Sequence, residues 1–314
     1  MSERSQVLSY AKRLEKAGLG PNKMATIDSS RERLRRVVKV MARPSGKLAE
    51  VAQARIKGPD GPIRVRIYKP KKGGPKNGSA PLVVFFHGGG WIVGDLDLSD
   101  EALRLLSGLS GAIIVSVEYR LAPEHPFPAG LEDCYAATTW AVEKAKTLGA
   151  DPRKLVVCGE SAGGNLAAAT TLLAKKRKGP KIAYQILIYP PLDLVRDQST
   201  YTDTELGRLT MAAAEMLWMR DNYLQDNKHE GIKNPLVSPI MGDLKGLPPA
   251  LIFTAENDPL TEQDRDYARK LRKAGVRVRL VNYPGAIHGF WNFPSHFDSG
   301  DDAVRKAARV LKSL

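Results

Sequence analysis

Residues 154–165 read KLVVCGESAGGN, an apolar run that passes directly into a glycine-rich turn and then into an alanine-rich segment. The apolar residues up to Cys158 predict a short buried strand, and the residues from Asn165 onward predict a helix. GESAG at 159–163 fits the pattern G-x-S-x-G, in which a serine sits on a sharp strand-to-helix turn with its hydroxyl above the sheet. We therefore predict that Ser161 is a nucleophile.

Short apolar runs alternate with helix-like segments on both sides of this turn. This alternation favours a parallel sheet covered on both faces, and right-handed crossovers favour a doubly wound arrangement. We predict the α/β class, with a mostly parallel, doubly wound, eight-stranded sheet. The expected strands are 49–57, 62–69, 81–87, 112–119, 154–159, 182–190, 249–255 and 276–283, and the expected helices are about 131–148, the segment after 165, about 262–274, and 301–314.

Two segments interrupt this rhythm. Residues 1–47 read as an amphipathic helix with breaks, and residues 196–236 are rich in Thr, Met and Trp and lack strand character. We expect both segments to lie outside the sheet and to form a helical cap over the site. Residues 48–195 and 237–314 then form the catalytic domain.

A second glycine-rich motif, HGGGW at 87–91, follows a predicted strand. Ester hydrolysis passes through a tetrahedral oxyanion, which needs preorganised N–H donors, and successive glycines present such groups without side chains in the way. We predict that the backbone N–H groups of Gly88, Gly89 and Gly90, together with that of Ala162, form an oxyanion hole.

A serine hydroxyl needs a base that removes its proton. The chain has five candidates: His87, His125, His229, His288 and His296. His288 lies between the last predicted strand and the last helix, at the carboxyl edge of the sheet where the nucleophile lies, and we predict that it is the base. We expect His87 to hold the glycine loop by hydrogen bonding. His229 falls in the predicted cap, and His125 falls in a proline-rich loop.

The acid that orients the base should lie between nucleophile and histidine in the chain. Asp258 follows the apolar run PALIFTA and precedes His288 by 30 residues (288 − 258). We predict that Asp258 holds the second imidazole nitrogen and stabilises the imidazolium. Glu256 and Asp193 remain rivals for this role.

Taken together, these residues resemble the hormone-sensitive-lipase family of carboxylesterases, which includes bacterial and archaeal members, over nearly the whole chain. The motifs that carry the resemblance are HGGGW at 87–91, EYRLAPEHPFPA at 118–129, GESAGGN at 159–165, ENDPL at 256–260 and HGF at 288–290.

This resemblance implies the α/β-hydrolase fold with a helical cap, and a triad of Ser161, Asp258 and His288. It also implies Gly89 as the chief donor of the loop and esters of short to medium acyl chains as substrates. Many relatives have Asp where this chain has Glu160; the charge is kept, so we expect no loss of activity. Relatives often dimerise through the strand that matches 276–283, so a homodimer is expected.

The expected chemistry is serine esterase catalysis through an acyl-enzyme, with no metal ion and no organic cofactor. Because the base must be neutral, activity should fall below about pH 6.5, adjusted by Asp258. Two alternatives use the same fold: an amidase or peptidase with the same triad, and a non-catalytic protein that binds a small molecule. Pocket candidates, for which ordinary packing is an equal alternative, are Trp91, Met211, Met216, Leu217, Trp218 and Phe290.

Composition sets the remaining bounds. The 314 residues include 48 Lys and Arg against 34 Asp and Glu, a net charge of +14. The basic residues are scattered and no nucleic-acid motif accompanies them, so we expect a solvated basic surface and no nucleic-acid partner. Two cysteines, Cys134 and Cys158, and the lack of an apolar leader predict a cytoplasmic location. No apolar stretch reaches the ~18 residues of a membrane span.

Overall fold

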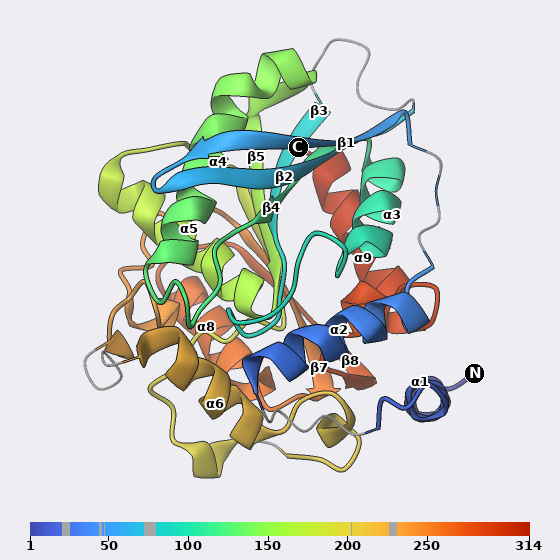
Figure 1. Cartoon of the computed structure of the whole chain (residues 1–314). Coiled ribbons are helices and arrows are strands. Elements are labelled where there is room, and N and C mark those ends of the chain that lie inside the picture. Colours follow the sequence, from blue (N-terminus) through green and yellow to red (C-terminus); the bar gives the residue numbers. More distant parts are fainter. Residues whose placement is uncertain (21–25, 44–45, 47, 72–79, 202, 226–230) are drawn as a thin grey trace.

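An eight-stranded sheet forms the centre of the molecule in the order β1-β2-β4-β3-β5-β6-β7-β8 (Figure 1). The computed structural model describes residues 1–20, 26–43, 46, 48–71, 80–201, 203–225 and 231–314. The pairs β1–β2 and β2–β4 are antiparallel and the other pairs are parallel, which confirms the predicted sheet. The strands are β1 (Glu50–Gly58), β2 (Gly61–Lys69), β3 (Ala80–Phe86), β4 (Ile113–Glu118), β5 (Ala150–Glu160), β6 (Tyr184–Ile188), β7 (Ala250–Asn257) and β8 (Val278–Ile287).

Strand β3 shows why the central strands read as continuous apolar runs. All seven of its residues are buried, because successive side chains point to opposite faces and both faces are covered. Leu82, Val84 and Phe86 belong to the core on one face of the sheet, whereas Val83 and Phe85 belong to the core on the other. The chain therefore builds two apolar layers from a single strand.

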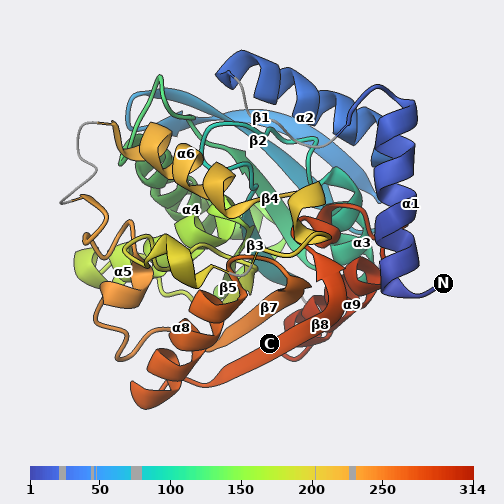
Figure 2. The ribbon, with the colours of Figure 1, turned by 90° about the horizontal axis from the view of Figure 1, so that it is seen from below.

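Helices cover both faces of the sheet (Figure 2). On one face lie α4 (Ala129–Leu148), α5 (Ala162–Arg177) and α8 (Thr261–Lys273); on the other lie α3 (Asp100–Ser110) and α9 (Asp298–Lys312). Our prediction lacked α3, whose sequence DEALRLLSGLS holds a glycine and two serines that lower helix propensity. Burial of Leu103 and Leu106 against the sheet outweighs that weak propensity.

Three further helices lie beyond the carboxyl ends of the parallel strands, below the sheet in Figure 1. They are α1 (Glu3–Lys16), α2 (Ile27–Met41) and α6 (Ala213–Leu224), preceded by a short 3₁₀ turn, η2 (Gly207–Leu209). We call residues 3–16, 27–41 and 203–224 the cover. Among the described residues, no helix has the length and apolar character needed to cross a membrane.

Few polar contacts attach the cover to the rest of the molecule. Arg31 of α2 donates two hydrogen bonds to the Glu124 carboxylate, each 2.7 Å long, and one of 2.9 Å to the carbonyl of Ile92. On α1, the carbonyl of Gln6 lies 3.0 Å from Nε2 of His296, and its side-chain oxygen accepts from the Asp298 N–H at 3.0 Å. Helix α2 thus contacts the loops that hold Ile92 and Glu124, and α1 contacts the residues just before α9 and its first turn.

Candidate active site

Ser161 stands on the turn between β5 and α5, in a backbone conformation that is rare for a residue with a side chain. Its φ is 54° and its ψ is −125°, a strained combination that projects the hydroxyl above the sheet. Two glycines permit the turn: a Cβ on Gly159 would lie 2.1 Å from the carbonyl oxygen of Gly163, and a Cβ on Gly163 would lie 2.0 Å from that of Phe86. Only glycine fits at both positions.

Three side chains from distant parts of the chain meet at this turn. Nε2 of His288 lies 2.9 Å from Oγ of Ser161, and its Nδ1 lies 2.7 Å from Oδ2 of Asp258. The other carboxylate oxygen of Asp258 accepts the N–H of Leu260 at 2.9 Å, which fixes the carboxylate. When the neutral imidazole carries its proton on Nδ1, that N–H donates to Asp258. Nε2 can then accept a hydrogen bond from the Ser161 hydroxyl.

The surroundings of His288 favour its protonated form. Burial disfavours the imidazolium, but the negative charge of Asp258, its hydrogen bond and the charge of Glu160 outweigh burial and raise the pKa of His288 above its ordinary 6.5. Asp258 is 1% exposed, so little water screens this interaction. The arrangement makes the imidazole a stronger base than it is in water.

The other candidate bases and acids lie elsewhere. Glu256 is exposed and accepts the N–H of Gly285 at 2.7 Å, and no contact joins Asp193 to the imidazole among the described residues. His125 is exposed, and His229 lies outside the described residues. No group of three or more His, Cys, Asp or Glu side chains within the described part of the chain is arranged to hold a metal ion.

His87 is fully buried next to the glycine loop, and its contacts are local. Its Nδ1 lies 2.7 Å from the carbonyl oxygen of Gly88, and its ring stacks on Tyr119 with 4.4 Å between centroids. The Tyr119 hydroxyl donates to the His87 carbonyl at 2.7 Å. Burial lowers the pKa of His87, so the ring is neutral near pH 7.

The glycine loop offers fewer free donors than the sequence predicted. The N–H of Gly88 donates to Oε1 of Glu160 at 2.8 Å, which removes Gly88 from the predicted set of oxyanion donors. The N–H groups of Gly89, Gly90 and Ala162 donate to no other residue in the described part of the chain. Ala162 is also the first residue of α5, and the dipole of a helix favours negative charge at its N-terminus.

Glu160 links this loop to the segment after His288. It is fully buried and accepts the side-chain N–H of Asn292 at 3.2 Å, and Asn292 in turn accepts the Ser99 hydroxyl at 2.6 Å. Burial raises the pKa of Glu160, whereas the charge of His288 and the hydrogen bonds lower it in part. Sequence reasoning singled out neither Asn292 nor Ser99, because no motif marks a side chain that only connects two loops.

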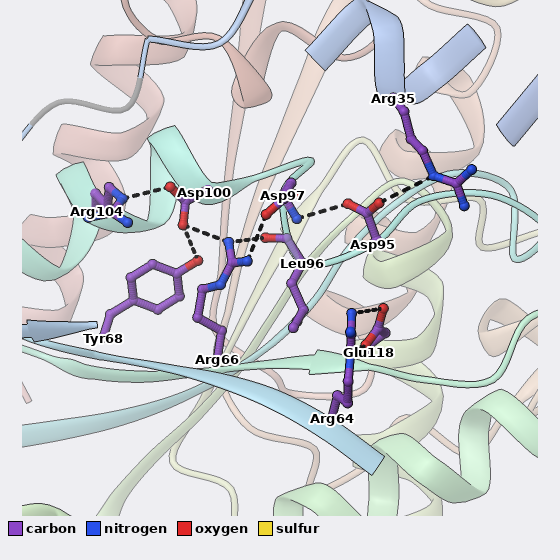
Figure 3. A network of polar contacts seen from close by, with 10 residues as sticks. All are labelled: Arg35, Arg64, Arg66, Tyr68, Asp95, Leu96, Asp97, Asp100, Arg104 and Glu118. Carbon is purple, nitrogen blue, oxygen red and sulfur yellow. Dashed lines mark hydrogen bonds and ion pairs between the residues drawn. The ribbon is translucent and has the colours of Figure 1, made fainter. Parts of the chain in front are cut away.

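Ion pairs fix the segment between the glycine loop and α3 (Figure 3). Arg66 of β2 donates to Asp97 at 2.7 Å and to Asp100 at 2.9 Å. From α2, Arg35 approaches Asp95 at 4.0 Å. The short contacts of Asp97 and Asp100 with Arg66 therefore hold this segment on the sheet. The longer contact between Asp95 and Arg35 ties it only weakly to the cover.

A cavity of about 140 Å³ opens beside Ser161 and His288, between the sheet edge and the cover. Every part of the cover contributes to its wall. Apolar and aromatic side chains that line it include Tyr10, Leu34, Val37, Leu209, Met211, Met219, Phe293 and Phe297.

Of the pocket residues predicted from the sequence, only Met211 lines this cavity. Trp91 is buried instead and stacks on Tyr223 with 4.6 Å between ring centroids. Phe290 is buried against Tyr189 and Tyr283. The predicted residues absent from the lining are Trp91, Met216, Leu217, Trp218 and Phe290.

The profile of a family described as alpha/beta hydrolase fold matches residues 83–292. Carboxylesterase NlhH of Mycobacterium tuberculosis is 39% identical over 260 residues, which cover 80% of this chain and 78% of the relative. An Arylesterase of Saccharolobus solfataricus is 37% identical over 252 residues, covering 80% of each chain. A solved structure, the hyperthermophilic esterase from the archaeon Pyrobaculum calidifontis, has a TM-score of 0.89 and 37% identity, covering 99% of this chain and 96% of that one.

Proposed function

The chain belongs to the alpha/beta hydrolase fold family and is a carboxylic ester hydrolase of the hormone-sensitive-lipase type, and from this membership we propose that Ser161 attacks the ester carbonyl. The observation that carries the proposal is the continuous hydrogen-bonded row from Ser161 through His288 to Asp258, beside free backbone N–H groups.

In the proposed reaction, His288 takes the Ser161 proton as the oxygen attacks. The tetrahedral oxyanion is stabilised by the N–H groups of Gly89, Gly90 and Ala162, an assignment supported by their lack of another partner among the described residues. His288 then protonates the leaving alcohol, and an acyl-enzyme forms on Ser161. Water, deprotonated by the same imidazole, releases the carboxylic acid and restores the serine.

The cavity supports esters with short acyl chains. Its volume of about 140 Å³ is close to that of a cavity of about 150 Å³ that holds benzene. We therefore expect acyl chains of up to about six carbons to fit without movement of the cover. A series of p-nitrophenyl esters from acetate to palmitate tests this, and a maximum at laurate or beyond would contradict it.

Three finer features belong to the same proposal. Residues 1–47 and 196–236 act as a cap, supported by the cavity wall that α1, α2 and α6 provide. A homodimer forms through residues 276–283, supported by the position of β8 at an edge of the sheet. A cytoplasmic location is supported by two buried free cysteines.

Labelling with a fluorophosphonate tests the nucleophile directly. We expect one modified peptide, carrying Ser161, and protection of that peptide by a hydrolysable short-chain ester. Ser161→Ala should lose both the label and turnover of p-nitrophenyl butanoate, with a drop in kcat on the order of 10⁴–10⁶. Unchanged turnover in a correctly folded Ser161→Ala variant would overturn the assignment.

A further inference from the structure

Among the described residues, one charged side chain lines the catalytic cavity away from Ser161 and its immediate neighbours. Arg33 of α2 shares the wall with apolar residues such as Leu34 and Val37, and it is half-buried. The other charged lining residue, Glu160, is fully buried and already holds Gly88 and Asn292. Arg33 is therefore a positively charged residue in the wall of the cavity that the substrate must enter.

Arg33 has few partners. Its Nη2 donates to the carbonyl oxygen of Gly20 at 2.7 Å, and no ion pair joins its guanidinium to a carboxylate among the described residues. The acid that influences it most, Glu215, accepts the N–H of Ala212 at 2.9 Å instead. A guanidinium carries five N–H donors, and among the described residues the side chain of Arg33 has no hydrogen-bond partner besides Gly20.

Two neighbouring arginines on α2 show that this condition is particular to Arg33. Arg31 is fully engaged with Glu124 and with backbone carbonyls. Arg36 makes the same kind of contact as Arg33, from Nη2 to the carbonyl of Ala17 at 2.9 Å, but it is exposed and does not line the cavity. Burial lowers the pKa of Arg33, so the protein bears a cost for keeping this charge in the cavity wall.

Tyr10 belongs to the same wall. It lines the cavity from α1, and it and Arg33 lie close enough that each affects the pKa of the other. Burial raises the pKa of Tyr10 to about 12, so near pH 7 the phenol is a neutral hydrogen-bond donor. An arginine and a tyrosine in the wall of one largely apolar cavity suit a carboxylate, which can accept hydrogen bonds from both.

We propose that Arg33, assisted by Tyr10, binds a carboxylate on the substrate, so that the preferred substrates are esters that carry a free acid group. This inference rests on the proposed function and names its substrate class. The cavity volume of about 140 Å³ places the acid a short chain away from the ester, as in monoesters of small dicarboxylic acids or acetates of small hydroxy acids.

Matched pairs of ethyl esters test the proposal, because a carboxylate can replace a terminal methyl group with little change of shape. Monoethyl glutarate is compared with ethyl pentanoate, and monoethyl adipate with ethyl hexanoate, by pH-stat. A second pair, 4-acetoxybutanoate and butyl acetate, places the acid on the alcohol side. The measured quantity is the ratio of kcat/KM for the acid-bearing ester to that for its neutral partner.

We expect Arg33→Gln to lower this ratio by about tenfold or more in the pair that the enzyme prefers, because only the acid-bearing ester loses a charged partner. Arg33→Lys should keep part of the ratio that Arg33→Gln loses, because lysine keeps the positive charge but lacks the paired N–H donors of the guanidinium. Arg36→Gln is the matched control and should leave the ratio as in the wild type.

Two results would overturn the proposal while leaving the esterase assignment in place. One is an unchanged ratio in Arg33→Gln, whether both esters keep their rates or lose them equally, and the other is the same change of ratio in Arg36→Gln. Failure of the proposed function is recognised separately, by turnover of ethyl pentanoate in Ser161→Ala.

Discussion

The rim of the sheet and the cover above it contribute to one cavity but are held in place by different means. The rim carries Ser161, Asp258 and His288 on turns that directly follow strands β5, β7 and β8. Close backbone contacts fix the Ser161 turn, and the N–H of Leu260 fixes the Asp258 carboxylate. The cover consists of helices held to the rest of the molecule by polar contacts between side chains and loops, such as the ion pair between Arg31 and Glu124 and the contact between Gln6 and His296. The difference suggests that the chemistry is set by the sheet and the choice of substrate by the cover, which can change without disturbing the reaction.

The largest effect should come from the rim. Asp258→Asn keeps the shape of the side chain but removes the charge that holds the Nδ1 proton of His288, so the imidazole can adopt the wrong tautomer. We expect kcat to fall on the order of 10⁴ with little change in thermal unfolding. Glu256→Gln, a nearby exposed carboxylate, is the control, and a similar loss in that variant would count against the assignment of the acid.

The glycine loop lies where rim and cover meet, and two neighbouring substitutions separate their contributions. In Gly89→Ala, whose φ is 108°, the new methyl group would lie 2.2 Å from the backbone oxygen of Val93. In Gly90→Ala, at φ 59°, it would meet the sulfur of Met219, the flexible end of a side chain of the cover. We expect kcat to fall about 10²–10³-fold for Gly89→Ala and clearly less for Gly90→Ala, measured with p-nitrophenyl acetate. Equal losses would mean that the cover is as rigid as the rim.

The pH profile tests the rim alone. Because the pKa of His288 is raised and the base must be neutral, kcat/KM should rise about tenfold per pH unit and level off only above pH 6.5. The free energy of unfolding should change in the opposite sense. The stabilisation that protonated His288 provides is fully present below pH 6.5 and is lost as pH rises through its raised pKa. His125→Gln, at an exposed position, should leave the profile unchanged. A plateau that begins below pH 6.5 would contradict the raised pKa.

The smallest effect should come from the cover. Met219→Ala shortens a buried side chain of α6 that lines the cavity, so it should admit acyl chains longer by about two carbons. We expect kcat/KM for p-nitrophenyl acetate to change less than about threefold while that for octanoate rises by a similar factor or more. Trp218→Phe, on the same helix but outside the cavity lining, is the control. A large loss of activity toward acetate would break the distinction between the two regions.

Sequence predicted the sheet and its rim well because both depend on local patterns. The apolar runs locate the strands, and the parallel topology brings the residues that follow β5, β7 and β8 to one edge. By contrast, the state of the Gly88 N–H depends on Glu160, 72 residues away, and no spacing rule foresees that bond. A motif therefore predicts which N–H groups can donate to the oxyanion, but it does not predict that a distant carboxylate already accepts one of them.

The cavity wall was predicted poorly for a related physical reason. Trp91 and Phe290 belong to the motifs HGGGW and HGF, but their large apolar surfaces are stabilised more by burial in the core than by a place in a cavity. Tyr10 and Arg33 line the cavity because two N-terminal helices dock on loops that lie far along the chain. A helical pattern indicates which face of a helix is apolar, but it does not indicate what that face will meet.

The docking of α1 has a consequence for biosynthesis. Gln6 contacts His296, and 290 residues separate the two in the chain. At elongation rates of about 5–20 residues per second, the ribosome needs roughly 15–60 s to deliver the surface on which this helix rests. Throughout that interval Tyr10, whose ring centroid lies 6.2 Å from that of Phe293 and 5.5 Å from that of Phe297, lacks these neighbours, so α1 leaves an apolar side chain open to chaperones until they have been made.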